Sequence, residues 1–250
     1  MLSTEGKLTE LVNRLKEMAG DNLESVVLYG SAARAEARGT YADLNVLCTL
    51  RSASVGELAR VAPVVRWWCK DQREPAPLFF TAEELRQSAD VFAIELLDMQ
   101  KGHRVLFGRD VVADIAVPMN LHRIQVEHDL RTLMLKLRQH FLLATANEAE
   151  LKAVMAKSIS SALALLRHTL IAYGEEPPTA PREVFARIAR LTGAEAAAFE
   201  TLLEVRNSDK HMDDIPRVYG RYLNALDKVT SALDDILPKK EWRRAHKASS

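Results

Sequence analysis

Gly30, Ser31, Asp43 and Asn45 are the residues whose types and spacing suit phosphate chemistry best. Gly30 and Ser31 follow the apolar run 26–29, and after an eleven-residue gap Asp43 opens a second apolar run. Glycine lets the backbone approach a phosphate closely, and turn amides with a serine hydroxyl can bind its oxygens. Residues i and i+2 of a strand project to the same face, where a carboxylate can hold a divalent metal. The set therefore predicts a site for metal-assisted nucleotidyl transfer.

Asn45 is the altered part of this set, because a second metal-binding carboxylate is expected at that position. Asparagine is neutral and offers one carbonyl oxygen to a metal. We therefore expect Asp43 and Asn45 to bind Mg²⁺ (or Mn²⁺) weakly, with the site impaired and not abolished.

Composition favours a cytoplasmic protein that makes no use of a membrane. Lys plus Arg and Asp plus Glu number 34 each, so no overall charge attracts nucleic acid, although a local basic groove stays open. The two cysteines, Cys48 and Cys69, lie in apolar contexts without metal-binding spacing, which indicates reduced thiols. The N-terminus lacks an apolar signal core, and no uncharged run approaches the ~20 residues of a membrane span.

The first half of the chain must position the Gly30–Asp43 set, and its patterns alternate between helix and strand. Helices are predicted over 5–19, from 31 to 37, over 54–72 with Pro63 splitting or kinking the element, and over 82–89 after a Thr81–Glu84 capping box. Strands are predicted over 25–29, 43–50, 78–80 and 103–107, and over part of 92–99. Trp67 and Trp68 are read as packing residues and not as a base-stacking platform.

The second half carries only helical patterns, over 120–145, 149–173, 183–191, 195–211 and 217–236. The predicted fold is an α+β N-terminal domain (1–117), with a small mixed sheet and flanking helices, and an all-α C-terminal helical bundle (118–238). Residues 239–250 form a basic tail that we expect to be flexible.

The ordered residues Tyr29, Gly30, Ser31, Asp43, Leu44, Asn45 and Val46 resemble the signature of the nucleotidyltransferase superfamily, in particular its minimal and kanamycin-nucleotidyltransferase-like branches. The resemblance implies nucleotide binding at Gly30, Ser31 and Arg34, and a catalytic, metal-binding role for Asp43. The family's third carboxylate sits on a later strand. Glu95 is the first candidate for this ligand or base and Asp98 the second, with ordinary surface charge as the alternative. Arg34 and Arg38 could contact triphosphate, or Arg34 could pair with a carboxylate such as Glu36 or Asp43.

A second motif, Arg206-Asn207 followed by His211, resembles that of HEPN domains, helical bundles that often accompany minimal nucleotidyltransferases. The resemblance implies metal-independent ribonuclease chemistry, with Arg206 and His211 catalytic across a homodimer formed through the helical bundle. A capping role for His211 at a helix end is the alternative. In toxin–antitoxin members a tyrosine two residues after the histidine accepts nucleotidyl groups. Asp213 stands there in this chain and Tyr219 is out of register, which puts a toxin–antitoxin-like role in doubt.

The sequence therefore supports three hypotheses for the function of the protein. The first is a nucleotidyltransferase-like protein that binds a nucleoside triphosphate with Mg²⁺ and transfers a nucleoside monophosphate to a hydroxyl of a small molecule, RNA or protein. The second is a degenerate, nucleotide-sensing regulatory pseudoenzyme. The third is the HEPN-type ribonuclease.

Overall fold

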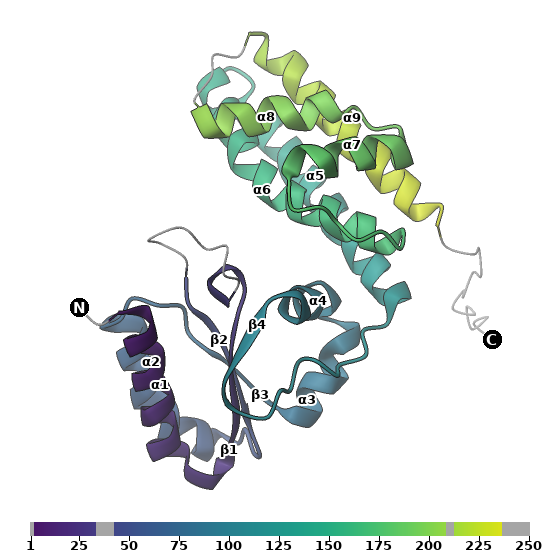
Figure 1. Cartoon of the computed structure of the whole chain (residues 1–250). Helices are drawn as coiled ribbons and strands as arrows, with labels where there is room; N and C mark the ends of the chain where they lie inside the picture. The colour runs from purple at the N-terminus through teal and green to yellow at the C-terminus, as the bar shows by residue number, and fades with distance from the viewer. Residues whose placement is uncertain (1–2, 34–42, 209–212, 237–250) are drawn as a thin grey trace, which may run out of the picture. The chain divides into compact units, whose positions relative to one another are not determined.

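The computed structural model describes residues 3–33, 43–208 and 213–236, which form two compact units divided between Pro118 and Met119. The first unit combines a sheet with helices, and the second is built from helices (Figure 1). This confirms the predicted fold class.

A four-stranded mixed sheet in the order β3-β2-β1-β4 is the framework of the first unit. β1 (Leu23–Tyr29) pairs antiparallel with β2 (Asn45–Leu50) and with β4 (His103–Gly108), and β2 pairs parallel with β3 (Leu78–Thr81). The register places Tyr29 opposite both Asn45 and His103. The end of β1 and the starts of β2 and β4 therefore meet at one edge of the sheet.

Helices cover both faces of this sheet (Figure 1). α1 (Thr4–Ala19) and α2 (Val55–Lys70) pack over one face, where Val26, Leu28, Val46 and Cys48 are buried. α3 (Ala82–Gln87) and α4 (Ala93–Lys101) pack over the other, with Val27 and Leu47 buried against them. This strict alternation is the pattern of a strand buried on both sides, and burying each Val or Leu side chain contributes roughly 1.5–3 kcal/mol.

Local sequence accounts for the ends and faces of these helices. Ser3 caps α1 by accepting a hydrogen bond from the Gly6 amide at 3.1 Å. The Thr81–Glu84 capping box predicted from sequence begins α3, with bonds of 3.1 and 2.7 Å. Trp68 is fully buried, and the Arg14 guanidinium lies 4.2 Å from the Trp67 ring centroid, which confirms packing roles for both tryptophans.

One local prediction in this unit was wrong, and two others hold only in part. The segment predicted as part strand over 92–99 belongs to helix α4, because Ala93, Leu96 and Met99 are buried at a helical spacing of three. Pro63 does not split α2, which runs through it with Val61, Val64 and Trp68 buried on either side of that position. The predicted helix after Gly30 is a 3₁₀ turn at Ser31–Ala33, beyond which residues 34–37 lie outside the described part of the chain.

The second unit contains α5 (Met119–Ala144), α6 (Glu148–Ala172), α7 (Pro181–Thr192), α8 (Ala196–Ser208) and α9 (Ile215–Asp234), close to the predicted helical segments. Its core includes a stacked Phe185–Phe199 pair with centroids 5.4 Å apart and a buried Tyr219 whose hydroxyl donates to the Leu137 carbonyl at 2.7 Å. Within the described ranges, every helix is too short or too polar to cross a membrane.

Candidate functional site

Gly30 makes the turn at the edge where the three strand ends meet. Its φ of +81° lies in the left-handed region that side chains rarely adopt, so glycine is required for conformation. Its amide donates to the Gly102 carbonyl at 3.2 Å, and its own carbonyl accepts from Ala33 at 3.2 Å, closing the turn. A Cβ at Gly30 would lie 3.4 Å from Nδ2 of Asn45, so the Asn45 side chain reaches the turn itself.

Asp43 and Asn45 reach this edge from the β2 side. The intervening Leu44 is 3% exposed and belongs to the core beneath α1 and α2. Alternation along β2 therefore places Asn45 on the opposite face, together with Leu47 and Tyr29. Asp43 stands two residues before β2, so the strand predicted to begin at Asp43 begins at Asn45 instead. Asp43 is exposed and Asn45 half-buried, so the carboxylate is open to a ligand from solvent.

Glu74 holds the backbone of Leu44, which stands between Asp43 and Asn45. This role was not predicted from the sequence. Its Oε2 accepts a hydrogen bond from the Leu44 amide at 3.1 Å, and its Oε1 pairs with Lys7 Nζ at 2.6 Å. Lys7 also donates to the Gln72 carbonyl at 3.1 Å, and the two charged side chains are 22% and 11% exposed. These contacts of Glu74 and Lys7 link α1, the segment after α2 and the entry to β2, so they fix the position of the backbone between Asp43 and Asn45.

The third carboxylate does not lie on a strand as predicted. Neither β3, with the sequence LFFT, nor β4, with HRVLFG, contains an acidic residue. Glu95 and Asp98 instead belong to helix α4, and both line a cavity of about 440 Å³ that also touches Gly30 and Tyr29. Glu95 is therefore in the neighbourhood of the turn, from a helix and not from the sheet.

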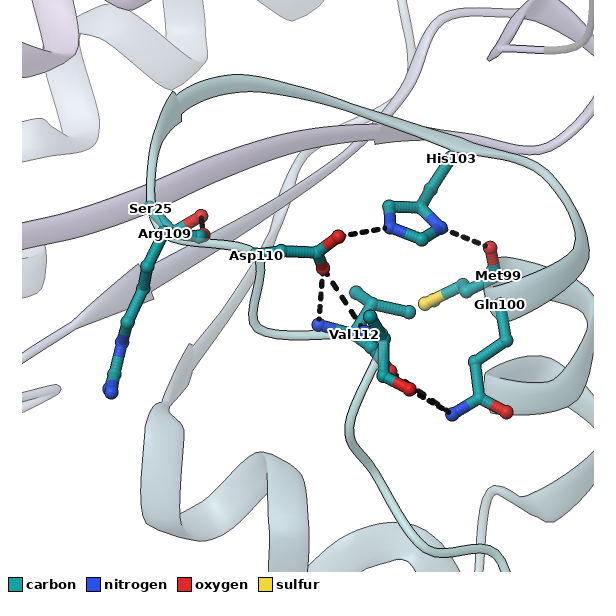
Figure 2. Close-up of polar contacts among 8 residues, drawn as sticks. Ser25, Met99, Gln100, His103, Arg109, Asp110 and Val112 are labelled. Atoms are coloured by element: carbon teal, nitrogen blue, oxygen red, sulfur yellow. Dashed lines mark hydrogen bonds and ion pairs between the residues drawn. The ribbon is translucent and has the colours of Figure 1, made fainter.

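A histidine–aspartate pair lies behind this edge and was not found from the sequence (Figure 2). His103, opposite Tyr29 in the register, contacts the Met99 carbonyl through Nδ1 at 3.0 Å and Asp110 Oδ2 through Nε2 at 2.8 Å. Both ring nitrogens thus lie within hydrogen-bond distance of oxygen atoms. With both nitrogens engaged, His103 is a structural clamp and not a general base.

Asp110 completes the clamp by binding backbone amides. Its Oδ1 accepts from the amides of Val112 and Ala113 at 3.0 and 3.1 Å. Burial raises the pKa of the Asp110 carboxyl, but the hydrogen bonds from His103 and the two amides, with the nearby His103 charge, outweigh it, so the pKa lies below its ordinary value. Gln100 reinforces the same loop by donating to the Val112 carbonyl at 3.1 Å (Figure 2). It also donates to the Ile115 carbonyl at 2.8 Å.

Several predicted site residues are not placed together. Arg34, Arg38 and His211 lie outside the described residues. Arg206 is exposed near the end of α8 and lines an open cavity of about 690 Å³ together with Lys152 and Lys157 of α6. Tyr219 is fully buried, and burial raises its pKa to about 12, which removes it from consideration as an exposed nucleotidyl acceptor. The ribonuclease hypothesis stays a prediction.

The described residues hold no cluster of three or more His, Cys, Asp or Glu side chains able to bind a metal by themselves. What the site edge does offer is hard oxygen donors, the Asp43 carboxylate and the Asn45 carbonyl. This set fits a single Mg²⁺ that takes its remaining ligands from phosphate and water. It does not fit a pair of metals held by protein carboxylates.

Comparison with known proteins places the fold. No protein-family model matches the sequence, and no curated protein matches it significantly. Ten chains of solved structures match. One is a crystal structure of the spectinomycin adenyltransferase AAD(9) from Enterococcus faecialis with ATP and spectinomycin. It is similar with a TM-score of 0.55 and 12% sequence identity, over 90% of this chain and 100% of that chain. The chain thus has the fold of a nucleotidyltransferase domain followed by a helical region.

Proposed function

We propose that this protein binds a nucleoside triphosphate with a divalent metal at the Gly30–Asp43 edge and transfers its nucleoside monophosphate to a hydroxyl acceptor. Gly30 and Ser31 would contact the phosphates, and Asp43 would be the principal protein ligand of the metal. Asn45 would be a weaker ligand through its carbonyl oxygen, and Glu95 the candidate base.

The observation that carries this proposal is that Asn45 meets the Gly30 turn at one edge of the sheet, with Asp43 two residues before Asn45 in the chain. Ser31 in the turn is exposed, so its hydroxyl is open to phosphate oxygens, and the Asp43 carboxylate is exposed as well. The similarity in fold to an adenyltransferase whose structure was determined with ATP supports the same interpretation.

A divalent metal bound here would neutralise charge that develops on the transferring phosphoryl group and on the leaving pyrophosphate. The residues of the chain would orient the triphosphate against the turn and hold one carboxylate at the metal. Because a single protein carboxylate supports this metal, we expect most of its ligands to come from the nucleotide and from water.

A second candidate is a nucleotide-sensing pseudoenzyme, and one specific observation favours it. Asn45 replaces an expected carboxylate, and strands β3 and β4 contain no acid that could serve as a third one. A site of this kind would bind metal and nucleotide but give little stabilisation to the transition state.

Substitution of Asn45 separates these two candidates. Asn45→Asp restores a second negative charge beside the metal, and we expect it to increase the rate of pyrophosphate release from a nucleoside triphosphate by roughly tenfold or more, about 1.4 kcal/mol of barrier. Asn45→Ser, which adds no charge, is the matched control. Release that is present in the wild type and rises only in Asn45→Asp supports the transferase. A folded Asn45→Asp protein that binds nucleotide but releases no pyrophosphate supports the pseudoenzyme.

A further inference from the structure

The cavity beside Gly30 has walls that are mainly apolar. Its volume is about 440 Å³, within the range of small-molecule sites, and its lining includes Leu78, Phe80, Leu85, Phe92, Leu96 and Met99. Its lining includes residues of α3 and α4, which cover the face of the sheet that Asn45 shares with Leu47. The cavity and the proposed phosphate site thus share the Gly30 turn.

Two of the lining side chains are exposed although they are large and apolar. Leu78 is 40% exposed and Phe92 43%, whereas Leu85 and Leu96 deeper in the wall are buried. Exposed apolar side chains gathered around a hollow indicate a surface that a ligand covers. The small volume suits a small molecule and not a segment of polypeptide or RNA.

Polar side chains are the minority in the wall, which holds the Tyr29 and Ser88 hydroxyls and the Glu95 and Asp98 carboxylates. A buried base needs partners for its ring nitrogens and exocyclic groups, and leaving them unpaired is costly. The Ser88 hydroxyl already donates to the Glu84 carbonyl at 2.7 Å. Tyr29 is half-buried, and burial raises its pKa, so at neutral pH it supplies a neutral hydroxyl. An aromatic or alkyl group would cover the Leu and Phe side chains without this cost.

We propose that the cavity binds the aromatic or alkyl part of a small hydroxyl-bearing molecule, the acceptor of the transfer, with its hydroxyl directed toward Gly30. This inference rests on the proposed function and defines its substrate class. The acceptor oxygen forms a bond to the α-phosphorus, and the bond from that phosphorus to the oxygen bridging to the β-phosphate breaks. Pyrophosphate leaves, and the hydroxyl proton passes to the carboxylate of Glu95, which lines the same cavity.

The binding part is tested on the full chain with N-phenyl-1-naphthylamine, a neutral apolar dye that fluoresces when it leaves water. We expect saturable binding at one site per chain, weakened about tenfold or more by Phe92→Ala. Val91→Ala is the matched control, since Val91 is apolar, 62% exposed and adjacent but does not line the cavity. Leu78→Ala is a second test from a different element and should weaken binding in the same direction. Absence of saturable binding, or equal loss in Val91→Ala, would overturn the proposal.

The acceptor role is tested by competition. Ethanol, 2-phenylethanol and 2-(1-naphthyl)ethanol should displace the dye with increasing strength in that order, while ATP with Mg²⁺ should leave it bound. Displacement by ATP would identify a nucleobase pocket and overturn the acceptor assignment. Nucleotide binding is measured separately by thermal stability. If the wild type binds the dye but no nucleotide, the proposed function and the acceptor role fail, while binding of an apolar ligand by the cavity stands.

Discussion

Asp43 and Asn45 stand two residues apart at the entry to β2 and differ by one negative charge. A carboxylate pair could hold two metal ions between protein and triphosphate, whereas Asp43 alone gives one charged ligand, with Asn45 beside the Gly30 turn. The affinity for metal should therefore depend strongly on the nucleotide's own phosphates. In physical terms, metal and nucleotide should bind together and each should bind poorly alone.

The hydrogen bonds that Asp110 accepts predict how the free energy of unfolding depends on pH. Because the folded-state pKa of Asp110 is lowered, its carboxylate contributes stability that is present above the unfolded value of about 3.8 and is lost as the pH falls through the folded value. The free energy of unfolding of the wild type should therefore fall toward that of Asp110→Asn as the pH drops below about 4. The difference should stay under about 1 kcal/mol, because the Asp110 side chain is 38% exposed. Urea unfolding of both proteins between pH 3 and 7 measures it.

Asp114→Asn is the control for this pH series, because it removes an acid from the same loop. At pH 7 it should leave the free energy of unfolding closer to that of the wild type than Asp110→Asn does, because it removes none of the bonds to His103, Val112 and Ala113. If the wild type stays more stable than Asp110→Asn by a constant free energy down to pH 3, the stabilising role of the Asp110 carboxylate is contradicted.

At the residue scale, Gly30, Asp43 and Asn45 could be predicted because their signal is local: an apolar run, a turn glycine and a polar residue opening the next run. His103, Asp110 and Glu74 could not, because their roles depend on pairings between distant parts of the chain. His103 acquires its place from a register opposite Tyr29, and Glu74 meets Leu44 across 30 positions of sequence.

Glu74 acts at the scale of elements, since it joins α1 and the segment after α2 to the entry of β2. Glu74→Ala removes the acceptor of the Leu44 amide and the partner of Lys7 together. We expect the free energy of unfolding to fall by about 1–3 kcal/mol, because the pair is largely but not fully buried. The stabilisation by metal and nucleotide should also decrease, since Asp43 and Asn45 flank the released amide. Urea unfolding and nucleotide-dependent melting measure the two effects.

Lys7→Ala separates these two effects, because it removes the ion pair but keeps Glu74 on the Leu44 amide. It should lower stability while leaving the nucleotide-dependent shift close to that of the wild type. Equal loss of the nucleotide effect in both variants, or loss in neither, would argue against positioning by Glu74. Glu74→Gln should recover part of the effect, because its amide oxygen can still accept from Leu44.

Helix and strand could be told apart from the sequence where the apolar residues recur at one regular spacing. This holds for α1, β1, β2 and the long helices of the second unit. The 92–99 segment was misread because apolar residues stand on nearly every position, so spacing alone did not separate helix from strand. Burial of Ala93, Leu96 and Met99 at a spacing of three residues shows that the segment is a helix. At Pro63, tertiary packing of α2 overrides a local helix-breaking preference.

At the scale of the whole molecule, the two units are each compact by themselves and have distinct architectures. The nucleotide hypothesis rests on the first unit alone, where the sheet brings the Gly30 turn and the Asp43–Asn45 segment to one edge. The fold likeness extends over 90% of the chain, so it includes the helical region as well. A nucleotide bound at the proposed edge should stabilise the first unit through contacts with the ends of β1 and β2.

The most direct test is the thermal stability of the wild type and Asp43→Ala with ATP, GTP, CTP or UTP, each with Mg²⁺, Mn²⁺ or EDTA. Ligand at about a hundred times its dissociation constant should stabilise the native state by roughly 2.7 kcal/mol. Asp43 is exposed, so Asp43→Ala should match the wild type without ligand, and Asp21→Ala, at the opposite end of β1, is the matched control. The account predicts a metal-dependent shift with at least one nucleotide that Asp43→Ala loses and Asp21→Ala keeps. No shift with any nucleotide, or a shift unchanged by EDTA and by Asp43→Ala, would contradict it.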